Sequence, residues 1–143
     1  MVDRRLAVEA WENLFRAQHE IFERISGDFD DTDLSQPEYD VLLTVTRAPR
    51  HTARLRDVTA NMLISQPSVS RLVDRMVSRG LLTKCADPED GRGSLVTATE
   101  AGKRAFRAIA AQHGKHIVER MQALDDDELA TLKALTQKLR DAL

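Results

Sequence analysis

The chain has 143 residues, enough for one domain with a substantial core, and its 42% hydrophobic and 31% charged residues are ordinary for a globular protein. A single cysteine excludes an intramolecular disulfide and a cysteine-rich zinc site. The formal net charge of −2 hides a segregation that favours a nucleic-acid partner for the middle of the chain, because residues 1–53 hold six basic against eleven acidic residues and residues 54–107 hold ten basic against six acidic.

Two helices are expected before the basic region. The first runs over about residues 6–29 and has a broad apolar face. The second starts at Ser35 and Glu38, which have the spacing of a capping box, and Pro37 falls in its first turn. An Ala-Pro pair at residues 48–49 stops this second helix.

Residues 55–80 predict two short helices joined by a tight turn. In the second of them, apolar residues recur at the i, i+3, i+4, i+7 spacing that places one stripe against a core. The stripe consists of Val69, Leu72, Val73 and Met76. Ser65 is the expected N-cap, Pro67 falls in the first turn, and Gly80 suits the left-handed residue just past the end.

The outer face of this second helix carries polar and basic side chains. Arg and Gln side chains reach purine edges in the major groove, and Ser side chains reach phosphates. The pair of helices therefore predicts a DNA-binding helix-turn-helix. The expected DNA contacts on it are Ser65, Gln66, Ser68, Ser70, Arg71 and Arg75.

Two short strands over residues 81–85 and 94–98 flank the turn-rich segment DPEDGRG and predict a β-hairpin. A helix-turn-helix followed by a hairpin is a winged helix. We expect Arg92, flanked by two glycines, at the tip of this wing, where it suits the narrow and negative minor groove. An ion pair with Asp90 inside the wing is the alternative, and Asp90 can support the wing by aiming Arg92.

Two helices complete the chain. Thr99 is expected to cap a helix over about residues 100–123, and Asp125 and Glu128 have capping-box spacing at the start of the last helix. These helices and the first one carry more apolar surface than a small winged domain can cover. Because closed two-fold dimers are the commonest oligomers, this excess predicts burial against a second copy.

Catalysis and metal binding find no positive support in the sequence. The four histidines lack carboxylate or cysteine partners at a recognisable ligand spacing, and no nucleophile triad or glycine-rich phosphate loop stands out. We expect no enzyme, no metal and no cofactor. The charged N-terminus does not resemble a signal peptide and no segment approaches a membrane span, so we expect a cytoplasmic protein without a membrane partner.

Four motifs in this order resemble the MarR family of bacterial transcription regulators, and the resemblance covers nearly the whole chain. The motifs are ISQPSVSRLVDRM at 64–76, RGLL at 79–82, DPEDGR at 87–92 and VTATEAG at 96–102. The resemblance implies a mainly α fold with a small β-hairpin wing, in which residues 35–99 form the winged helix-turn-helix. It also implies that residues 1–34 and residues 100–143 are dimerisation helices.

The family further implies a homodimer that binds double-stranded DNA at a pseudo-palindromic operator and regulates transcription, here expected to act as a repressor. Relatives often bind a small aromatic or phenolic effector between the dimer helices and the winged domain. The residues expected to line such a crevice are Trp11, Phe15, His19 and Tyr39, with Arg16 or Arg47 as anion partner, although the same aromatic residues equally fit a core. This chain departs from the family in having Gly91-Arg92 where paired arginines are usual, and Ala98 where Leu is usual.

Two alternatives stay open. A winged protein-interaction module that has lost DNA binding would fit the acidic total and the missing wing arginine, but it should carry apolar anchors on the face that holds Arg71. A redox sensor would use Cys85, since some relatives sense oxidants through cysteine. Those cysteines usually lie near the start of the chain, and Cys85 has only Lys84 as a basic neighbour, so we expect a quiet, partly buried thiol.

Overall fold

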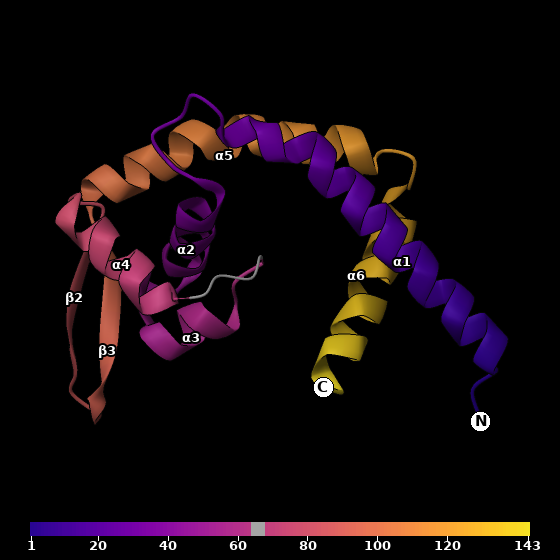
Figure 1. Ribbon diagram of the computed structural model, residues 1–143, viewed down its shortest axis with the longest axis horizontal. Coiled ribbons are helices and arrows are strands. Elements are labelled where there is room, and N and C mark those ends of the chain that lie inside the picture. Colours follow the sequence, from indigo (N-terminus) through magenta and orange to yellow (C-terminus); the bar gives the residue numbers. More distant parts are fainter. Residues whose placement is uncertain (64–67) are drawn as a thin grey trace. The chain divides into compact units, whose positions relative to one another are not determined.

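The computed structural model describes residues 1–63 and 68–143, which are mainly helical with one small antiparallel sheet (Figure 1). The chain divides into two compact units, one formed by Met1–Ile25 with His113–Leu143 and the other by Ser26–Gln112. The predicted fold class is confirmed. The predicted division by function at residues 34 and 99 stays a prediction, and the compact units divide the chain at other points.

The unit of Ser26–Gln112 holds the helix-turn-helix and the wing. Its elements in chain order are η1 (Ser26–Phe29), α2 (Gln36–Arg47), η2 (Pro49–His51), β1 (Thr52–Arg54), α3 (Leu55–Ala60), α4 (Val69–Ser78), β2 (Leu82–Asp87), β3 (Asp90–Ala98) and the first half of α5 (Glu100–Met121).

Helix α2 begins as the sequence predicts. The Ser35 hydroxyl accepts a hydrogen bond of 3.3 Å from the backbone N–H of Glu38, and the Glu38 carboxylate accepts one of 2.8 Å from the backbone N–H of Ser35. Both groups would otherwise lack helical partners, so this capping box fixes where α2 starts. Pro37 lies in the first turn, and the helix ends at Arg47, because the backbone of the C-cap Ala48 is extended.

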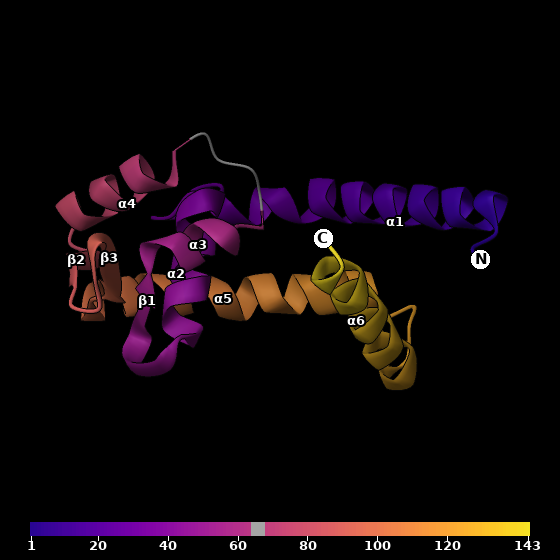
Figure 2. The ribbon, with the colours of Figure 1, turned by 90° about the horizontal axis from the view of Figure 1, so that it is seen from below.

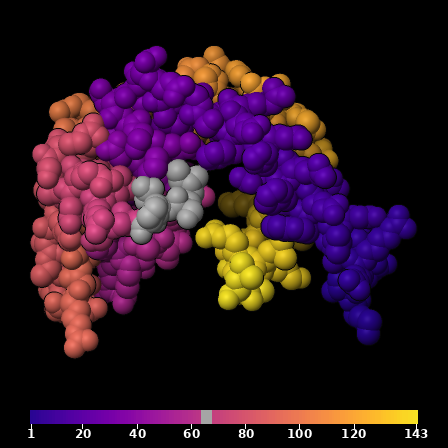
Figure 3. Space-filling model, in the orientation of Figure 1, coloured from indigo at the N-terminus to yellow at the C-terminus, as the bar shows by residue number. Residues whose placement is uncertain are grey.

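The sheet has the strand order β1-β3-β2, and both pairs are antiparallel. The β2–β3 hairpin is longer than predicted, because pairing continues to Asp87 and Asp90 and leaves a turn of only Pro88 and Glu89. The turn of the hairpin projects beyond the helices of its unit (Figures 1 and 3). Strand β1 pairs with the other end of β3, where Thr52 lies opposite Thr97.

The core of this unit lies between α2, α3, α4 and the sheet, with residues of all four contributing to one apolar cluster. The predicted stripe on α4 is confirmed, since Val69, Leu72, Val73 and Met76 are all buried. Each such side chain contributes roughly 1.5–3 kcal/mol relative to an exposed one. The stripe therefore fixes which face of α4 turns outward.

The start of α5 packs against the segment that follows α4. The Thr99 hydroxyl caps α5 by accepting from the backbone N–H of Gly102 at 3.0 Å, and it donates to the carbonyl of Gly80 at 2.6 Å. A Cβ at Gly102 would lie 2.1 Å from the carbonyl oxygen of Leu81, so only glycine fits there. Gly80 has a φ of 77°, as predicted for the residue just past the helix.

The other unit contains α1 (Arg4–Ile25), the second half of α5 and α6 (Asp126–Asp141) (Figure 2). The predicted capping box of α6 is confirmed, with hydrogen bonds of 2.8 and 3.1 Å between Asp125 and Glu128. Helix α1 ends at Ile25, earlier than predicted, because residues 26–29 form the 3₁₀ turn η1.

Large apolar side chains of this unit are exposed. They include Leu6, Val8, Trp11 and Phe15 on α1, Ile117 and Val118 on α5, and Leu135 and Leu139 on α6. In the described part of the chain, none of the helices combines the length and the apolar character that a membrane crossing requires.

Candidate nucleic-acid interface

Helix α4 presents a polar face opposite its buried stripe. Ser70, Arg71 and Arg75 are exposed on it. Asp74 is also exposed, but it is engaged by Lys84 of β2 at 3.0 Å. Among residues 1–63 and 68–143, the side chains of Arg71 and Arg75 make no ion pair, so two arginines of this face are available to an anionic partner.

The start of α4 differs from the sequence prediction. Ser68 is the N-cap, with φ −147° and ψ 98°, and its hydroxyl accepts from the backbone N–H of Arg71 at 3.3 Å. With Ser65 as the expected N-cap, Ser68 would fall inside the first turn. In the structure Ser68 directly precedes Val69, the first residue of α4, and a serine there satisfies a free helical N–H equally well. The other two expected contacts at this end, Ser65 and Gln66, lie outside the described residues.

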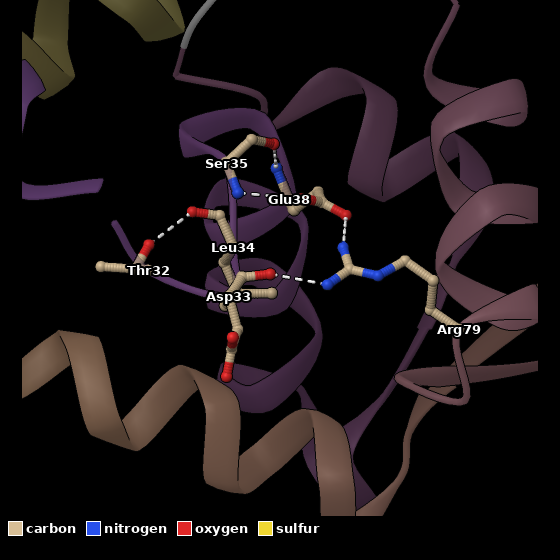
Figure 4. A network of polar contacts seen from close by, with 6 residues as sticks. All are labelled: Thr32, Asp33, Leu34, Ser35, Glu38 and Arg79. Carbon is tan, nitrogen blue, oxygen red and sulfur yellow. Dashed lines mark hydrogen bonds and ion pairs between the residues drawn. The ribbon is translucent and has the colours of Figure 1, made fainter. Parts of the chain in front are cut away.

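Arg79 ties the end of α4 to the start of α2 (Figure 4). Its guanidinium donates to the Glu38 carboxylate and, at 2.6 Å, to the carbonyl of Asp33. Glu38 thus caps its own helix with one oxygen and holds Arg79 with the other. Sequence reasoning assigned Arg79 no such role, and its partners are about 40 residues away, so no local pattern could reveal them.

The wing places Arg92 differently from the prediction. Arg92 lies in strand β3, three positions past the turn residue Glu89, and is not at the tip. The backbone N–H of Arg92 donates to the Asp90 carboxylate at 3.1 Å. Over the described ranges, no ion pair joins the two side chains, so Asp90 supports the backbone here and leaves the exposed guanidinium available.

A hollow of about 410 Å³ lies between the wing and α3. Three arginines line it: Arg54 from β1, Arg56 from α3 and Arg92 from β3. Arg54 is engaged by acidic residues of the wing turn, whereas Arg56 and Arg92 make no ion pair with any described residue. Sequence reasoning named only Arg92 of these three, since the pairing of β1 with β3 that brings them together is not a local feature.

The four residues predicted for an effector crevice fall in different units. Trp11, Phe15 and His19 follow one another along α1, with ring centroids 5.6 and 6.3 Å apart, and line a hollow of about 340 Å³ together with Arg16. Tyr39 is buried in the core of the other unit against Phe29 and Phe106, which accords with the core alternative for this residue.

Tyr39 has a perturbed ionisation. Burial of its hydroxyl raises the pKa of Tyr39 above the usual value of 10.0. The charge of Arg47 opposes this shift, and the charge of Asp40 adds to it. The positive charge of Arg47 therefore lowers the pKa of Tyr39, as expected of a cation near a phenol.

The expectation of a partly buried Cys85 is wrong. Cys85 is exposed on β2, whose residues from Thr83 to Ala86 are all exposed, because β2 is an edge strand with no regular alternation of burial. The described residues contain no group of three or more His, Cys, Asp or Glu side chains that could hold a metal ion.

Comparisons with known proteins agree with this architecture. The model of the MarR family matches residues 32–93. The chain is 26% identical over 136 residues to the uncharacterized HTH-type transcriptional regulator YkoM of Bacillus subtilis, covering 92% of this chain and 86% of that protein.

Two solved structures share the fold. Sco3205, a MarR family transcriptional regulator from Streptomyces coelicolor solved in complex with DNA, matches with a TM-score of 0.81 at 17% identity, covering 100% of this chain and 91% of that one. BpsR of Bordetella bronchiseptica, whose DNA binding is regulated by 6-hydroxynicotinic acid, matches with a TM-score of 0.74 at 24% identity, covering 91% of both chains.

The family match spans α2, the helix-turn-helix and most of the wing, and the shared fold extends over the terminal helices. Arg71 and Arg75 of α4 and Arg92 of β3 are exposed basic side chains, the type of group that commonly contacts phosphates and base edges in DNA-binding proteins. By the match over residues 32–93 and the fold of nearly the whole chain, the protein is similar to the MarR family of transcription regulators, which are DNA-binding proteins and not enzymes.

Proposed function

We propose that this protein is a cytoplasmic, homodimeric repressor that binds a pseudo-palindromic operator. The observation that carries the proposal is the polar face of α4, opposite the buried stripe, where Arg71 and Arg75 are exposed and make no ion pair with any residue that the structure describes. The stripe fixes the orientation of α4, so the arginines are presented by a rigid element. Such a face supplies both base contacts and phosphate contacts in a major groove.

The proposed contacts divide by chemistry. Arg71 reads a purine edge, while Arg75, Ser70 and the predicted residues Ser65 and Gln66 position the helix on the duplex. Ser68 serves α4 as its N-cap. At the same end of the helix it approaches the sugar-phosphate backbone of the DNA. From strand β3, Arg92 reaches the minor groove beside the wing, and Asp90 supports its backbone.

Dimer formation is supported by the exposed apolar residues of the terminal unit. Leu135 and Leu139 are more than half exposed, as are Trp11 and Phe15. Burying such side chains against the same residues of a second copy gives a closed two-fold interface. A dimer with two-fold symmetry then requires two DNA half-sites whose centres lie about one helical turn of DNA, 34–36 Å, apart.

Effector control is supported by one relative. DNA binding by BpsR is regulated by 6-hydroxynicotinic acid, a small aromatic acid. In this chain, Trp11, Phe15, His19 and Arg16 offer aromatic rings and a cation on α1 to a ligand of that class. The ligand would release DNA by favouring a dimer geometry whose recognition helices no longer match the half-sites.

The interaction-module alternative finds no apolar anchor where it needs one. The exposed positions of α4 are serine, arginine and aspartate, and none carries a large apolar side chain. Protein interfaces are organised around buried aromatic or aliphatic anchors. The face is therefore better matched to DNA than to a protein partner.

Footprinting on the DNA beside the protein's own gene tests the proposal. We expect two protected half-sites related by two-fold symmetry, centred about one helical turn apart, with one dimer bound per site. Protection of a single half-site, or of no defined site, would overturn the dimeric operator-binding function. In a transcription assay, operator binding should lower transcript yield, and an increase would overturn the repressor role.

A further inference from the structure

Two carboxylates of the wing turn hold the guanidinium of Arg54, the last residue of β1. Its Nε lies 3.1 Å from Asp87 Oδ2, and its Nη2 lies 2.6 Å from Glu89 Oε2. The Asp87 side chain is 4% exposed, whereas that of Glu89 is 78% exposed. The pair with Asp87 is therefore the one shielded from water, and the pair with Glu89 contributes little.

Asp87 also organises the turn of the wing. Its Oδ1 accepts a hydrogen bond of 2.9 Å from the backbone N–H of Glu89, while its Oδ2 faces Arg54. Asp87 is the last paired residue of β2, and the regular register shifts between it and Ala86. One buried carboxylate thus connects the irregular end of the hairpin to β1, a strand that precedes the helix-turn-helix.

The contrast among the three arginines of the hollow indicates different roles. The charge of Arg54 is matched by Asp87 and Glu89, whereas Arg56 and Arg92 have no ion-pair partner in the part of the chain that the structure describes. The two carboxylates offset the positive charge of Arg54, and they engage its Nε and Nη2. Arg54 is therefore less able than Arg56 or Arg92 to attract a phosphate.

We propose that Arg54 is a positioning residue that fixes the turn of the wing and thereby presents Arg92 to DNA, without touching DNA itself. The inference rests on the proposed DNA-binding function. Without Arg54, the Asp87 carboxylate stays buried and uncompensated, and a two-stranded ribbon loses the anchor at its end. Arg92 must then be ordered by the DNA at the moment of binding, which weakens the complex.

Operator binding over a salt series separates positioning from contact. Arg54→Ala and Asp87→Asn should each lower operator affinity about tenfold and leave the slope of log K against log salt unchanged, because no phosphate contact is lost. Arg92→Ala should lower that slope by about one unit. Glu89→Ala is the matched control from the same turn and should have little effect, since its side chain is exposed.

A double-mutant cycle and a conservative variant complete the test. Arg54→Ala combined with Asp87→Asn should bind no more weakly than either single variant, because both remove one interaction. Arg54→Lys should recover part of the affinity, since an ammonium can still pair with Asp87. A salt slope lowered by about one unit in Arg54→Ala, or wild-type affinity in that variant, would overturn the proposal.

Hydrogen exchange without DNA distinguishes failure of this inference from failure of the proposed function. In Arg54→Ala, backbone amides of β2 and β3 near the turn should exchange faster, while those of α2 should keep wild-type protection and so report an intact fold. If the wild-type protein shows no preference for any operator, the proposed function fails. Faster exchange in the wing of Arg54→Ala would still support the inference that Arg54 fixes the turn. Unchanged exchange in the wing of Arg54→Ala would overturn the inference that Arg54 fixes the turn.

Discussion

Gly102 illustrates how one residue can be required by its surroundings. A Cβ at this position would lie 2.1 Å from the carbonyl oxygen of Leu81, which accepts the backbone N–H of Thr99 and cannot easily shift. Gly102→Ala should therefore lower the free energy of unfolding by roughly 1–3 kcal/mol, the usual range for overpacking. Urea denaturation measures this change.

Gly114 provides the matched control in the same helix. A Cβ there would meet no atom within 4 Å. Because alanine is the better helix former, Gly114→Ala should raise the free energy of unfolding by about 0.5–1 kcal/mol. Equal effects of the two substitutions would show that the contact with Leu81 does not decide the outcome.

Tyr39 supplies a pH-dependent prediction. Burial raises its folded-state pKa above 10.0, the charge of Arg47 opposing and that of Asp40 reinforcing the shift. The stability linked to this group is therefore fully present below the pKa of the unfolded chain and is lost as pH rises through the folded-state pKa. Tyr39 is the single tyrosine, so ultraviolet absorbance of tyrosinate reports on it alone.

The titration of Tyr39 should have a higher midpoint in the native protein than in urea. Coincident midpoints would contradict the burial of its hydroxyl in the core. The stability of the protein measured over the same pH range should fall as tyrosinate forms, since ionisation favours the unfolded state.

At the residue scale, the sequence predicted what depends on local chemistry. The capping boxes at Ser35 and Asp125 were recognisable because both partners lie within one helical turn. The position of Arg92 in strand β3 was not recognisable, because its neighbouring glycines indicated a loop. Strand pairing continues past these glycines because Asp87 and Asp90 face each other. The exposure of Cys85 was not recognisable either, because it follows from the place of β2 at the edge of the sheet.

At the scale of elements, α4 and the wing should differ in what they contribute to DNA binding. Arg71→Ala should relax discrimination at specific base pairs and weaken operator binding by about 1–3 kcal/mol, since a base contact is lost. Arg92→Ala should weaken binding to many sequences and lower the salt slope by about one unit, as expected for a backbone or groove contact. Competition binding with single-base operator variants measures both effects.

Lys84→Ala is a suitable control for this pair. Lys84 is a basic residue of the wing, but its ammonium is engaged by Asp74. Its removal should therefore change the salt slope less than removal of Arg92. Identical profiles for Arg71→Ala and Arg92→Ala would mean that the roles of the two elements are wrongly assigned.

The elements themselves were largely predictable, and their association was not. Hydrophobic periodicity placed the buried stripe of α4, because a helix with one apolar face must turn that face to a core. The pairing of β1 with β3 and the attachment of Arg79 to Glu38 join residues more than 40 positions apart. No periodicity encodes such contacts, so they require the three-dimensional structure.

At the scale of the whole molecule, the exposed apolar residues of the terminal unit predict a dimer. Leu139 is 59% exposed on α6, and Leu135 one turn away is 56% exposed. Leu139→Glu should shift the protein from dimer to monomer, because a carboxylate would be buried in the interface without a partner. Sedimentation velocity over a range of concentrations measures the change.

Ala130→Glu introduces the same side chain on the opposite side of α6 and should leave the dimer intact. A wild-type protein that is monomeric at micromolar concentration, or a Leu139→Glu variant that stays dimeric, would contradict this use of the terminal helices. The apolar excess was visible in the sequence, but which side chains stay exposed depends on how α1, α5 and α6 pack within their unit.

Fluorescence anisotropy most directly tests whether this chain reads a DNA sequence. The purified protein would be titrated against labelled duplexes from the DNA beside its own gene, with a scrambled duplex as control, over a series of salt concentrations. Tight binding to one duplex, with a preference over the scrambled control that persists at physiological salt, is the predicted result. Weak binding that is equal for both duplexes and disappears as salt rises would contradict the account.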